Sequence, residues 1–250
     1  MSGVLAEQRA LVTGGASGIG RAIAIALAAE GAAVAIVDLA DPAKSTTTVA
    51  AIEQAGGRAF ALRADIADEA QVLALFADAI PRLGGLDILV NCAGILFEKP
   101  LLDTTAAEFD RLIAVNLRGT FLVGREALRV MTRQRRGRVI NVASELAYLG
   151  CERMSVYCAS KGAVVSLTRS WAREFAPDIL VNAIAPGPTD TPMLTTDHMD
   201  AATVAGSGNV PLGRIGRPEE IAAAAVFLAA PANSYMTGQC INPNGGAVML

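Results

Sequence analysis

The stretch Ala10-Leu-Val-Thr-Gly-Gly-Ala-Ser-Gly-Ile-Gly20 decides the fold of this chain. Its first four residues are apolar or β-branched and predict a buried strand, and an alanine-rich helix is expected over 18–29. Glycines at positions 14, 18 and 20 let the backbone turn tightly between these elements and approach a pyrophosphate closely. The amino end of the helix adds free N–H groups and a positive dipole. The spacing Gly-x-x-x-Gly-x-Gly indicates either a nucleotide-binding loop or an ordinary tight turn.

The alternation of short strands with longer helical patterns continues along the chain. It predicts an α/β fold in which right-handed crossovers place helices on both faces of a parallel sheet. We expect a doubly wound Rossmann fold of about seven strands in a single domain over 1–250, with an irregular substrate lid at about 188–217. The predicted strands are 10–13, 33–38, 59–63, 86–91, 138–142, 180–184 and 239–241, and the predicted helices are 18–29, 46–54, 68–82, 105–135 with glycine interruptions at 119 and 124, 155–175 and 218–230.

Composition argues against several classes of protein. Hydrophobic residues make up 52% of the 250 residues, enough for a large core, and the net charge of −3 gives no reason to expect binding to nucleic acid. The longest apolar stretch, 221–231, is too short to cross a membrane, and the first residues lack the apolar segment of a signal peptide. No C-x-x-C pair occurs and His198 is the one histidine, so we expect no metal site and reduced thiols in a cytoplasmic protein. The cysteines are Cys92, Cys151, Cys158 and Cys240.

A second informative pattern is Tyr157-Cys-Ala-Ser-Lys161, with Ser144 upstream at the end of a predicted strand. Residues four apart share one face of a helix. An ammonium beside a phenol lowers the tyrosine pKa toward working pH, as a general acid/base requires. The Ser144 hydroxyl can hold and polarise a substrate oxygen. Taken alone, Tyr-x-x-x-Lys also describes a common surface pair.

Asp38 ends the second predicted strand. A carboxylate there can accept hydrogen bonds from the hydroxyls of an adenosine ribose, and it would repel a 2′-phosphate. No Arg or Lys stands at Ala16, Ser17 or Leu39 to receive such a phosphate. The pattern therefore favours NAD(H) over NADP(H) as the cofactor. A simpler alternative is that Asp38 only caps the end of the strand.

Together these segments resemble the short-chain dehydrogenase/reductase family, over nearly the whole chain. The resemblance implies an NAD-type oxidoreductase with a Ser-Tyr-Lys-Asn tetrad that acts on a secondary alcohol or ketone without a metal, and it implies a homotetramer. The matching motifs, in order, are Thr13-Gly-x-x-x-Gly-x-Gly20, Asp65-Ile66, Asn91-Cys-Ala-Gly94, Asn116, Ser144, Tyr157-x-x-x-Lys161, Pro186-Gly187 and Arg217-Pro-Glu-Glu-Ile221.

The resemblance assigns a role to each tetrad residue. Tyr157 would give or take the hydroxyl proton, and Ser144 would bind the substrate carbonyl. Lys161 would hold the nicotinamide ribose and keep the phenol acidic. Asn116 would hold a water in a proton relay behind the lysine, although its amide could equally be satisfied by neighbouring backbone.

The resemblance also extends the predicted cofactor site. Asp65 and Ile66 would flank the adenine, and Asn91 would stand where the chain lines the cofactor after the fourth strand. With the glycine loop and Asp38, the predicted cofactor-binding residues are Gly14, Ser17, Gly18, Ile19, Gly20, Asp38, Leu39, Asp65, Ile66, Asn91, Ala93, Gly94, Tyr157, Lys161, Pro186, Gly187, Thr189 and Thr191.

Three positions depart from the family pattern. Cys92 stands where a second asparagine is usual, and Asn244 stands where an aspartate commonly precedes two glycines. The second change puts subunit contacts taken from relatives in doubt. Glu145, directly after Ser144, either tunes substrate choice or faces solvent.

The expected substrate is a medium-sized, mostly apolar alcohol or ketone. Besides Ser144, the predicted substrate-binding residues are Leu146, Cys151, Met154 and Met193, and the predicted lid also offers Leu194, His198, Met199 and Val210. The apolar character of most of these side chains argues against a heavily hydroxylated sugar.

Two rows of arginines leave alternatives open. Arg125, Arg129 and Arg133 are spaced by four, as are Arg169 and Arg173. They could dock an acidic acyl carrier protein, as in the family's 3-oxoacyl-carrier-protein reductases, or be solvated and paired with Glu126 and Glu174. A non-catalytic nucleotide-binding regulator or a scaffold is the alternative from another class.

Overall fold

Seven parallel strands form the central sheet of the described chain, residues 3–40 and 42–249. This computed structural model has the strand order β3-β2-β1-β4-β5-β6-β7. Strands β2 and β3 are added on one side of β1, and β4 to β7 are added on its other side. The predicted doubly wound α/β fold is confirmed, and every predicted strand is present. The strands are β1 (Arg9–Thr13), β2 (Ala33–Asp38), β3 (Arg58–Arg63), β4 (Ile88–Asn91), β5 (Gly137–Val142), β6 (Ile179–Ile184) and β7 (Cys240–Ile241).

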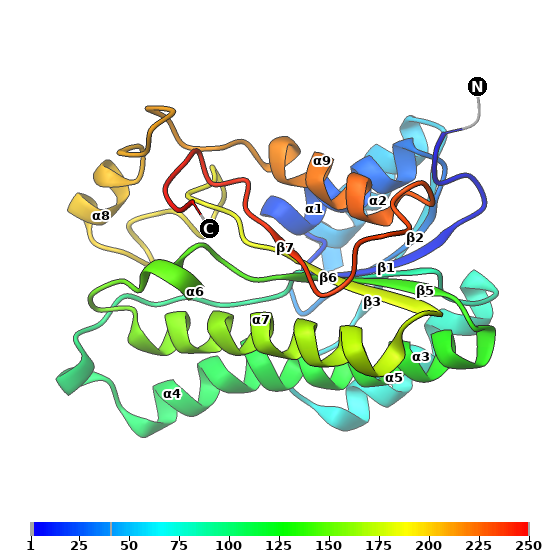
Figure 1. Cartoon of the computed structure of the whole chain (residues 1–250), viewed down its shortest axis with the longest axis horizontal. Helices are drawn as coiled ribbons and strands as arrows, with labels where there is room; N and C mark the ends of the chain where they lie inside the picture. Colours follow the sequence, from blue (N-terminus) through cyan, green and yellow to red (C-terminus); the bar gives the residue numbers. More distant parts are fainter. Residues whose placement is uncertain (1–2, 41, 250) are drawn as a thin grey trace.

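Helices cover both faces of this sheet (Figure 1). The short helices α6 and α8 lie at the end where the strands terminate, beyond the sheet. One layer consists of α1 (Gly18–Ala29), α2 (Pro42–Gln54) and α9 (Pro218–Ala229), and the other of α3 (Glu69–Leu83), α4 (Ala106–Ile113), α5 (Thr120–Gln134) and α7 (Ser155–Phe175).

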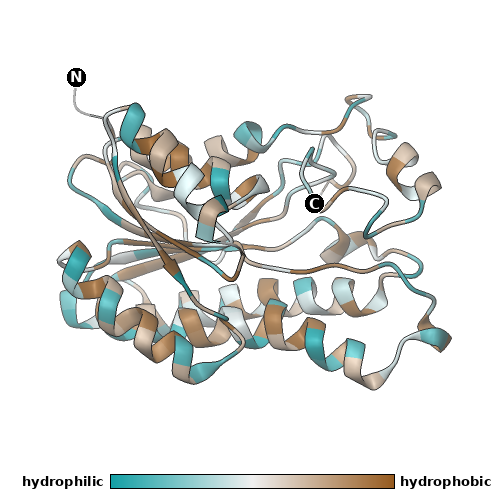
Figure 2. Ribbon diagram, turned by 180° about the vertical axis from the view of Figure 1, so that it is seen from behind, coloured by the Kyte–Doolittle hydropathy of each residue, from teal (hydrophilic) through white to brown (hydrophobic). Residues whose placement is uncertain are grey.

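The core lies on both sides of the sheet. Ala10 and Val12 of β1 pack in a cluster with α1 and α9, whereas Leu11 between them packs with α3, α5 and α7. In Figure 2 the central strands are largely hydrophobic, while the helices alternate between hydrophobic and hydrophilic residues. Strands covered on both faces need apolar side chains at successive positions, which explains the continuous apolar runs in the sequence.

The predicted helix over 105–135 contains a π-helical turn, η2 (Ala114–Gly119), between α4 and α5. The interruption expected near Gly119 is therefore present. The one expected at Gly124 is wrong, because this residue lies inside α5. A Cβ at Gly124 would overlap the ring of Trp171 on α7, so the glycine allows two helices to pack closely.

The segment predicted as an irregular lid also contains a helix, α8 (Ala201–Gly206), which the sequence analysis missed. The side chain of Asp200 caps it by accepting a hydrogen bond from Thr203 N at 2.8 Å. Two further short elements were not predicted, η1 (Leu101–Asp103) and α6 (Leu146–Leu149). No helix among the described residues combines the length and hydropathy needed to span a membrane.

Candidate active site

A cleft of about 530 Å³ lies at the carboxyl edge of the sheet, where residues following β1, β2, β4, β5 and β6 meet. A reversal of strand order leaves a crevice at this edge, the usual ligand site of doubly wound folds. Most of the predicted site residues line it. They are Gly14, Ser17, Gly18, Ile19, Asp38, Leu39, Asp65, Ile66, Ala93, Gly94, Ser144, Leu146, Cys151, Met154, Tyr157, Lys161, Pro186, Gly187, Thr189, Thr191 and Met193.

The glycine-rich loop after β1 is held by its own backbone and by Thr13. Gly14 has φ +69°, and a Cβ there would lie 2.8 Å from Ala93 Cα. A Cβ at Gly20 would overlap the carbonyl oxygen of Gly14. Thr13 Oγ1 accepts hydrogen bonds from Cys92 N and Ala93 N at 3.1 and 3.2 Å, which ties the ends of β1 and β4 together. The loop is therefore fixed in a shape that only glycine permits.

Asp38 joins this loop to the end of β2. Its Oδ2 accepts a hydrogen bond from Ala16 N at 3.0 Å and its Oδ1 accepts one from Ala40 N at 2.9 Å. The carboxylate thus caps the strand end, as the simpler prediction had it, and also lines the cleft beside Leu39. Each oxygen retains a lone pair that a ribose hydroxyl could use.

Ser144, Tyr157 and Lys161 converge on the same cleft. Tyr157 and Lys161 lie on the buried face of α7, and each side chain is more than nine-tenths buried. The Ser144 hydroxyl lies close enough to the Tyr157 phenol to lower its pKa. Lys161 Nζ donates to the carbonyl oxygen of Val142 at 2.8 Å and lies 5.8 Å from the centroid of the Tyr157 ring. The predicted juxtaposition of hydroxyl, phenol and ammonium is present.

Burial dominates the pKa values of this group. It raises the pKa of Tyr157 to about 12, opposed by the nearby Ser144 hydroxyl. It also lowers the pKa of Lys161 to about 8. The expected lowering of the tyrosine pKa toward neutrality is not found for the chain alone, because loss of water around the phenol is the largest influence on it.

The side-chain amide of Asn116 is occupied by neighbouring groups. Its Oδ1 accepts from Ile95 N at 2.8 Å, and its Nδ2 donates to the carbonyl oxygen of Ile95 at 2.9 Å and to Ser160 Oγ at 3.2 Å. The backbone alternative for this amide is thus correct. The π-helical turn η2 carries the residue, and such turns recur at functional sites.

Some predicted residues do not line the cleft. Asn91 is buried at the end of β4, and its Nδ2 donates to Asn141 Oδ1 at 2.9 Å. Its place beside the cofactor stays a prediction. Of the residues offered by the lid, Leu194 and Met199 line the cleft and His198 and Val210 do not. The tetrad and cofactor residues outside the lining are Gly20, Asn91 and Asn116.

Other lining residues escaped sequence reasoning. Arg111 and Val115 lie four residues apart just before Asn116, a helical spacing that could have identified them. Thr203 and Ser207 come from the unpredicted region of α8. Besides Lys161, Arg111 is the one basic residue among the described residues that line the cleft.

Two of the departures from the family pattern have clear surroundings. Glu145 is 6% exposed and lines the cleft, so the alternative that it faces solvent is wrong. Asn244 is also buried, and it stabilises the loop near the carboxyl terminus. Its Oδ1 accepts from Gly246 N at 2.9 Å and its Nδ2 donates to the carbonyl oxygen of Val248 at 3.0 Å.

Glu98, in the segment that follows β4, anchors the lid segment. Its carboxylate pairs with Arg153 Nε at 2.9 Å and accepts a hydrogen bond from Asp200 N at 3.0 Å. Its backbone N–H donates to the carbonyl oxygen of His198 at 3.1 Å. Because Arg153 lies two residues before α7, one carboxylate joins the lid to the start of the helix that carries Tyr157.

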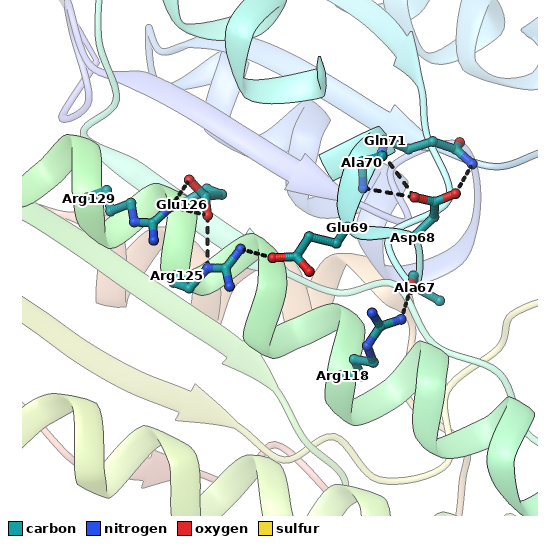
Figure 3. A network of polar contacts seen from close by, with 9 residues as sticks. All are labelled: Ala67, Asp68, Glu69, Ala70, Gln71, Arg118, Arg125, Glu126 and Arg129. Atoms are coloured by element: carbon teal, nitrogen blue, oxygen red, sulfur yellow. Dashed lines mark hydrogen bonds and ion pairs between the residues drawn. The ribbon is translucent and has the colours of Figure 1, made fainter. Parts of the chain in front are cut away.

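The arginines of α5 are mostly neutralised. Arg125 pairs with Glu69 at 2.6 Å and with Glu126 at 2.9 Å, and Arg129 pairs with Glu126 at 2.8 Å (Figure 3). The predicted pairing with Glu126 is therefore present. Within residues 3–40 and 42–249, no acidic side chain forms an ion pair with Arg133, Arg169 or Arg173.

The cleft thus contains a glycine-rich loop, the cradle, that suits a pyrophosphate, and the carboxylate of Asp38, which suits a ribose. It also contains the phenol of Tyr157 with the Ser144 hydroxyl and the Lys161 amine. The family model described as enoyl-(acyl carrier protein) reductase matches residues 14–248. A short-chain dehydrogenase/reductase of Armillaria gallica is 43% identical, with 96% of this chain and 95% of that protein covered. This chain belongs to the short-chain dehydrogenase/reductase family. It is an oxidoreductase of CH–OH groups that depends on NAD(P).

Other similar proteins have more specific names. The cis-4-hydroxycyclohexanecarboxylate dehydrogenase of Sinomonas cyclohexanicum is 43% identical over 98% of both chains. A 3-oxoacyl-(acyl-carrier-protein) reductase of Thermotoga maritima is 37% identical, covering 96% of this chain and 97% of that protein. The crystal structure of a dehydrogenase/reductase from Sinorhizobium meliloti superimposes with a TM-score of 0.92 at 40% identity, over 99% of this chain and 98% of that one.

Proposed function

We propose that this enzyme transfers a hydride between NAD(H) and a secondary alcohol/ketone pair, with Tyr157 as the general acid/base. The observation that carries the proposal is that the glycine-rich cradle and the Ser144–Tyr157–Lys161 group line one cleft. Its apolar walls exclude water from the reacting groups and strengthen their electrostatic interactions.

The residues at the cradle fit a dinucleotide. The first N–H groups of α1, from Gly18 onward, receive no side-chain cap from Ser17 and can donate to the pyrophosphate. Asp65 Oδ1 accepts a hydrogen bond from Ala67 N at 2.9 Å, and Asp65 Oδ2 can accept one from the adenine amino group. The segment from Pro186 to Thr191 holds the nicotinamide end. The nicotinamide supplies the hydride acceptor or donor, and the chain orients it and manages one proton.

The proton belongs to the phenol oxygen of Tyr157. At neutral pH burial keeps this phenol protonated, so it is ready to donate to a ketone oxygen that the Ser144 hydroxyl holds. In the oxidation direction the phenol first releases its own proton to solvent, and the phenolate oxygen then takes the proton from the alcohol. Lys161, with a pKa lowered to about 8, is mostly an ammonium at pH 7 and stabilises the phenolate electrostatically as it forms. Asn116 positions the Ile95 loop and Ser160, and a role for Asn116 in a proton relay is part of the proposal.

Asp38 makes NAD(H) the favoured cofactor. Its carboxylate stands where the adenosine ribose would lie, and neither Ala16, Ser17 nor Leu39 brings a positive charge to that point. A 2′-phosphate would meet a negative charge that is held in place by two backbone N–H groups.

The substrate end of the cleft is mostly apolar. Leu96, Leu146, Met154, Met193 and Met199 line it. Such walls suit a medium-sized alcohol or ketone with a hydrocarbon skeleton, and they offer little to a polyhydroxylated sugar. The relative that acts on cis-4-hydroxycyclohexanecarboxylate supports an alicyclic skeleton as the first to test.

A panel of secondary alcohols and ketones, each with NAD(H) and NADP(H), tests the proposal by the absorbance of the reduced nicotinamide. We expect turnover of alicyclic or similar apolar members, with a higher kcat/KM for NAD(H). Binding of the cofactor without turnover of any member would leave the non-catalytic regulator as the better account.

Reduction of a carrier-bound 3-oxoacyl group is the second candidate. It is supported by the relative of that name and by Arg133, Arg169 and Arg173, which form no ion pair with the acidic side chains that the structure describes. Docking of an acidic carrier on these arginines would weaken as salt is added. A kcat/KM for the carrier-linked substrate that is independent of salt contradicts such docking.

We also propose that the chain forms a single catalytic domain with a lid over about 188–217. We propose that four such chains assemble into a homotetramer in the cytoplasm. The groove between α5 and α7 supports assembly, because Phe121, Leu128, Trp171 and Phe175 line it and Phe121 is 41% exposed. Four free thiols suit a reducing compartment. Light scattering of the purified protein measures the assembly directly, and a monomer at micromolar concentration would contradict it.

A further inference from the structure

Glu145 is a buried carboxyl group that the proposed mechanism does not use. It follows Ser144 directly, lines the cleft and is 6% exposed. Its Oε2 is buried and has no hydrogen-bond partner among the described residues. A buried polar atom without a partner costs free energy, and such atoms in a ligand cleft often acquire their partner from the ligand.

The backbone around Glu145 is fixed, so the position of its carboxyl group is constrained. Glu145 N donates to the carbonyl oxygen of Pro186 at 3.0 Å, and its own carbonyl oxygen accepts from Tyr148 N at 2.9 Å at the start of α6. Burial is the main cause of the raised pKa of Tyr157, and the Glu145 carboxyl, which lines the same cleft, adds a smaller electrostatic increase. The unpartnered oxygen therefore belongs to the catalytic end of the cleft.

The protonation state of Glu145 restricts which ligand group suits it. Burial raises the pKa of this carboxyl to about 7, so both of its forms are populated at neutral pH. An ammonium suits only the carboxylate form, and a ligand carboxylate suits only the protonated form. A hydroxyl can donate to the first form and accept from the second, so it pairs with Glu145 in either state.

We infer that Glu145 is a specificity-determining residue that recognises a second hydroxyl group on a substrate whose reacting carbinol or carbonyl is held by Ser144 and Tyr157. The substrate class is then a diol or hydroxyketone on a hydrocarbon skeleton. The apolar walls formed by Leu146, Met154 and Met193 leave the remaining skeleton without polar partners. This inference rests on the proposed oxidoreductase function.

The experiment compares cyclohexanol with 1,2-, 1,3- and 1,4-cyclohexanediol as NAD-dependent substrates. Glu145→Leu removes the hydrogen-bonding group, Glu145→Gln keeps a donor and an acceptor at similar size, and Glu152→Gln is an exposed control nearby. We expect the wild-type enzyme to prefer at least one diol over cyclohexanol. We expect Glu145→Leu to lower kcat/KM for that diol by about tenfold or more beyond any change for cyclohexanol, as loss of a hydrogen bond to a charged group does. The Gln variant and the control should keep the preference.

Other outcomes overturn the inference. Equal losses for the diol and cyclohexanol would show that Glu145 only maintains the site. A raised KM for NAD in Glu145→Leu, with the diol preference intact, would show that its partner is the cofactor. A wild-type enzyme without any diol preference would refute it as well.

Measurements of ligand binding distinguish failure of the proposed function from failure of the inference about Glu145. If the wild-type chain turns over no member of the set, the proposed reaction fails, and thermal unfolding with each compound in the presence of NAD then tests Glu145 alone. A ligand stabilises the folded state according to its affinity. Greater stabilisation by a diol than by cyclohexanol, lost in Glu145→Leu, supports the inference, and equal stabilisation by both refutes it.

Discussion

Replacing Glu145 by glutamine should change how the stability of the protein depends on pH. Burial raises the pKa of this carboxyl from 4.5 to about 7 in the folded protein. Between these values the unfolded chain has released the proton and the folded chain still holds it, so stability falls as pH rises through this interval. A shift of about 2.5 pKa units at about 1.36 kcal/mol each gives a loss of about 3 kcal/mol, complete above about pH 8. Glutamine does not titrate, so the variant lacks this loss.

Urea denaturation at pH 5, 6, 7 and 8 measures the effect. The fall in the free energy of unfolding between pH 5 and pH 8 should be about 2 to 3 kcal/mol larger in the wild type than in Glu145→Gln, since the first part of the loss precedes pH 5. All other titrating groups contribute to both proteins and cancel in the difference. Glu152→Gln, at an exposed position, should follow the wild type. Parallel curves for the wild type and Glu145→Gln would show that the carboxyl is already ionised at low pH, and would refute the reasoning.

Three further substitutions test other parts of the site. Asp38→Ala should raise the KM for NAD about tenfold or more and reduce the preference over NADP, because it removes a charged hydrogen-bond acceptor; unchanged cofactor kinetics would contradict the ribose contact. Glu98→Gln removes the ion pair with Arg153, so amide hydrogen exchange in the lid near Asp200 should become faster. The KM for the substrate should rise several-fold and the KM for NAD should not change. Unaltered exchange in the lid would argue against the anchor. Gly20→Ala should weaken NAD binding, because its Cβ would displace the carbonyl of Gly14, and it fails as a prediction if calorimetry gives the wild-type affinity.

The sequence was sufficient for the fold because its local signals agree with one another. Apolar strands, glycine turns and helical patterns alternate without interruption, and only one sheet architecture accommodates them. The helix over Ser155–Phe175 was predicted with its observed bounds, since a long amphipathic pattern places its buried face unambiguously. The break expected at Gly124 failed because a glycine that permits close packing against Trp171 has the same local signature as one that ends a helix.

The site was predictable where chemistry follows a strand end. Asp38, Ser144 and the glycine loop stand at carboxyl ends of strands, and a parallel sheet brings these ends to one edge. Side-chain direction was not predictable, because the hydrogen bond between Asn91 and Asn141 joins neighbouring strands and leaves no local pattern in the sequence. The pKa of Tyr157 was misjudged because burial cannot be read from a spacing of four residues.

The short helix α8 and the anchor at Glu98 depend on contacts between segments far apart in the chain. Six residues form too short a helix to produce a clear periodic pattern. Glu98 meets Asp200 across about one hundred positions of sequence, and no local rule connects them. These are features that only the tertiary structure supplies.

The most direct test of the account is the Tyr157→Phe variant, measured for both turnover and NADH binding. The substitution removes the phenol oxygen and leaves the ring that packs against Leu146 and Met154 in the same apolar cluster. The account predicts a fall in kcat of at least about a hundredfold, the scale of a lost general acid/base, with the affinity for NADH within a few-fold of wild type. A variant that turns over at nearly the wild-type rate would contradict the central claim that this phenol carries the proton.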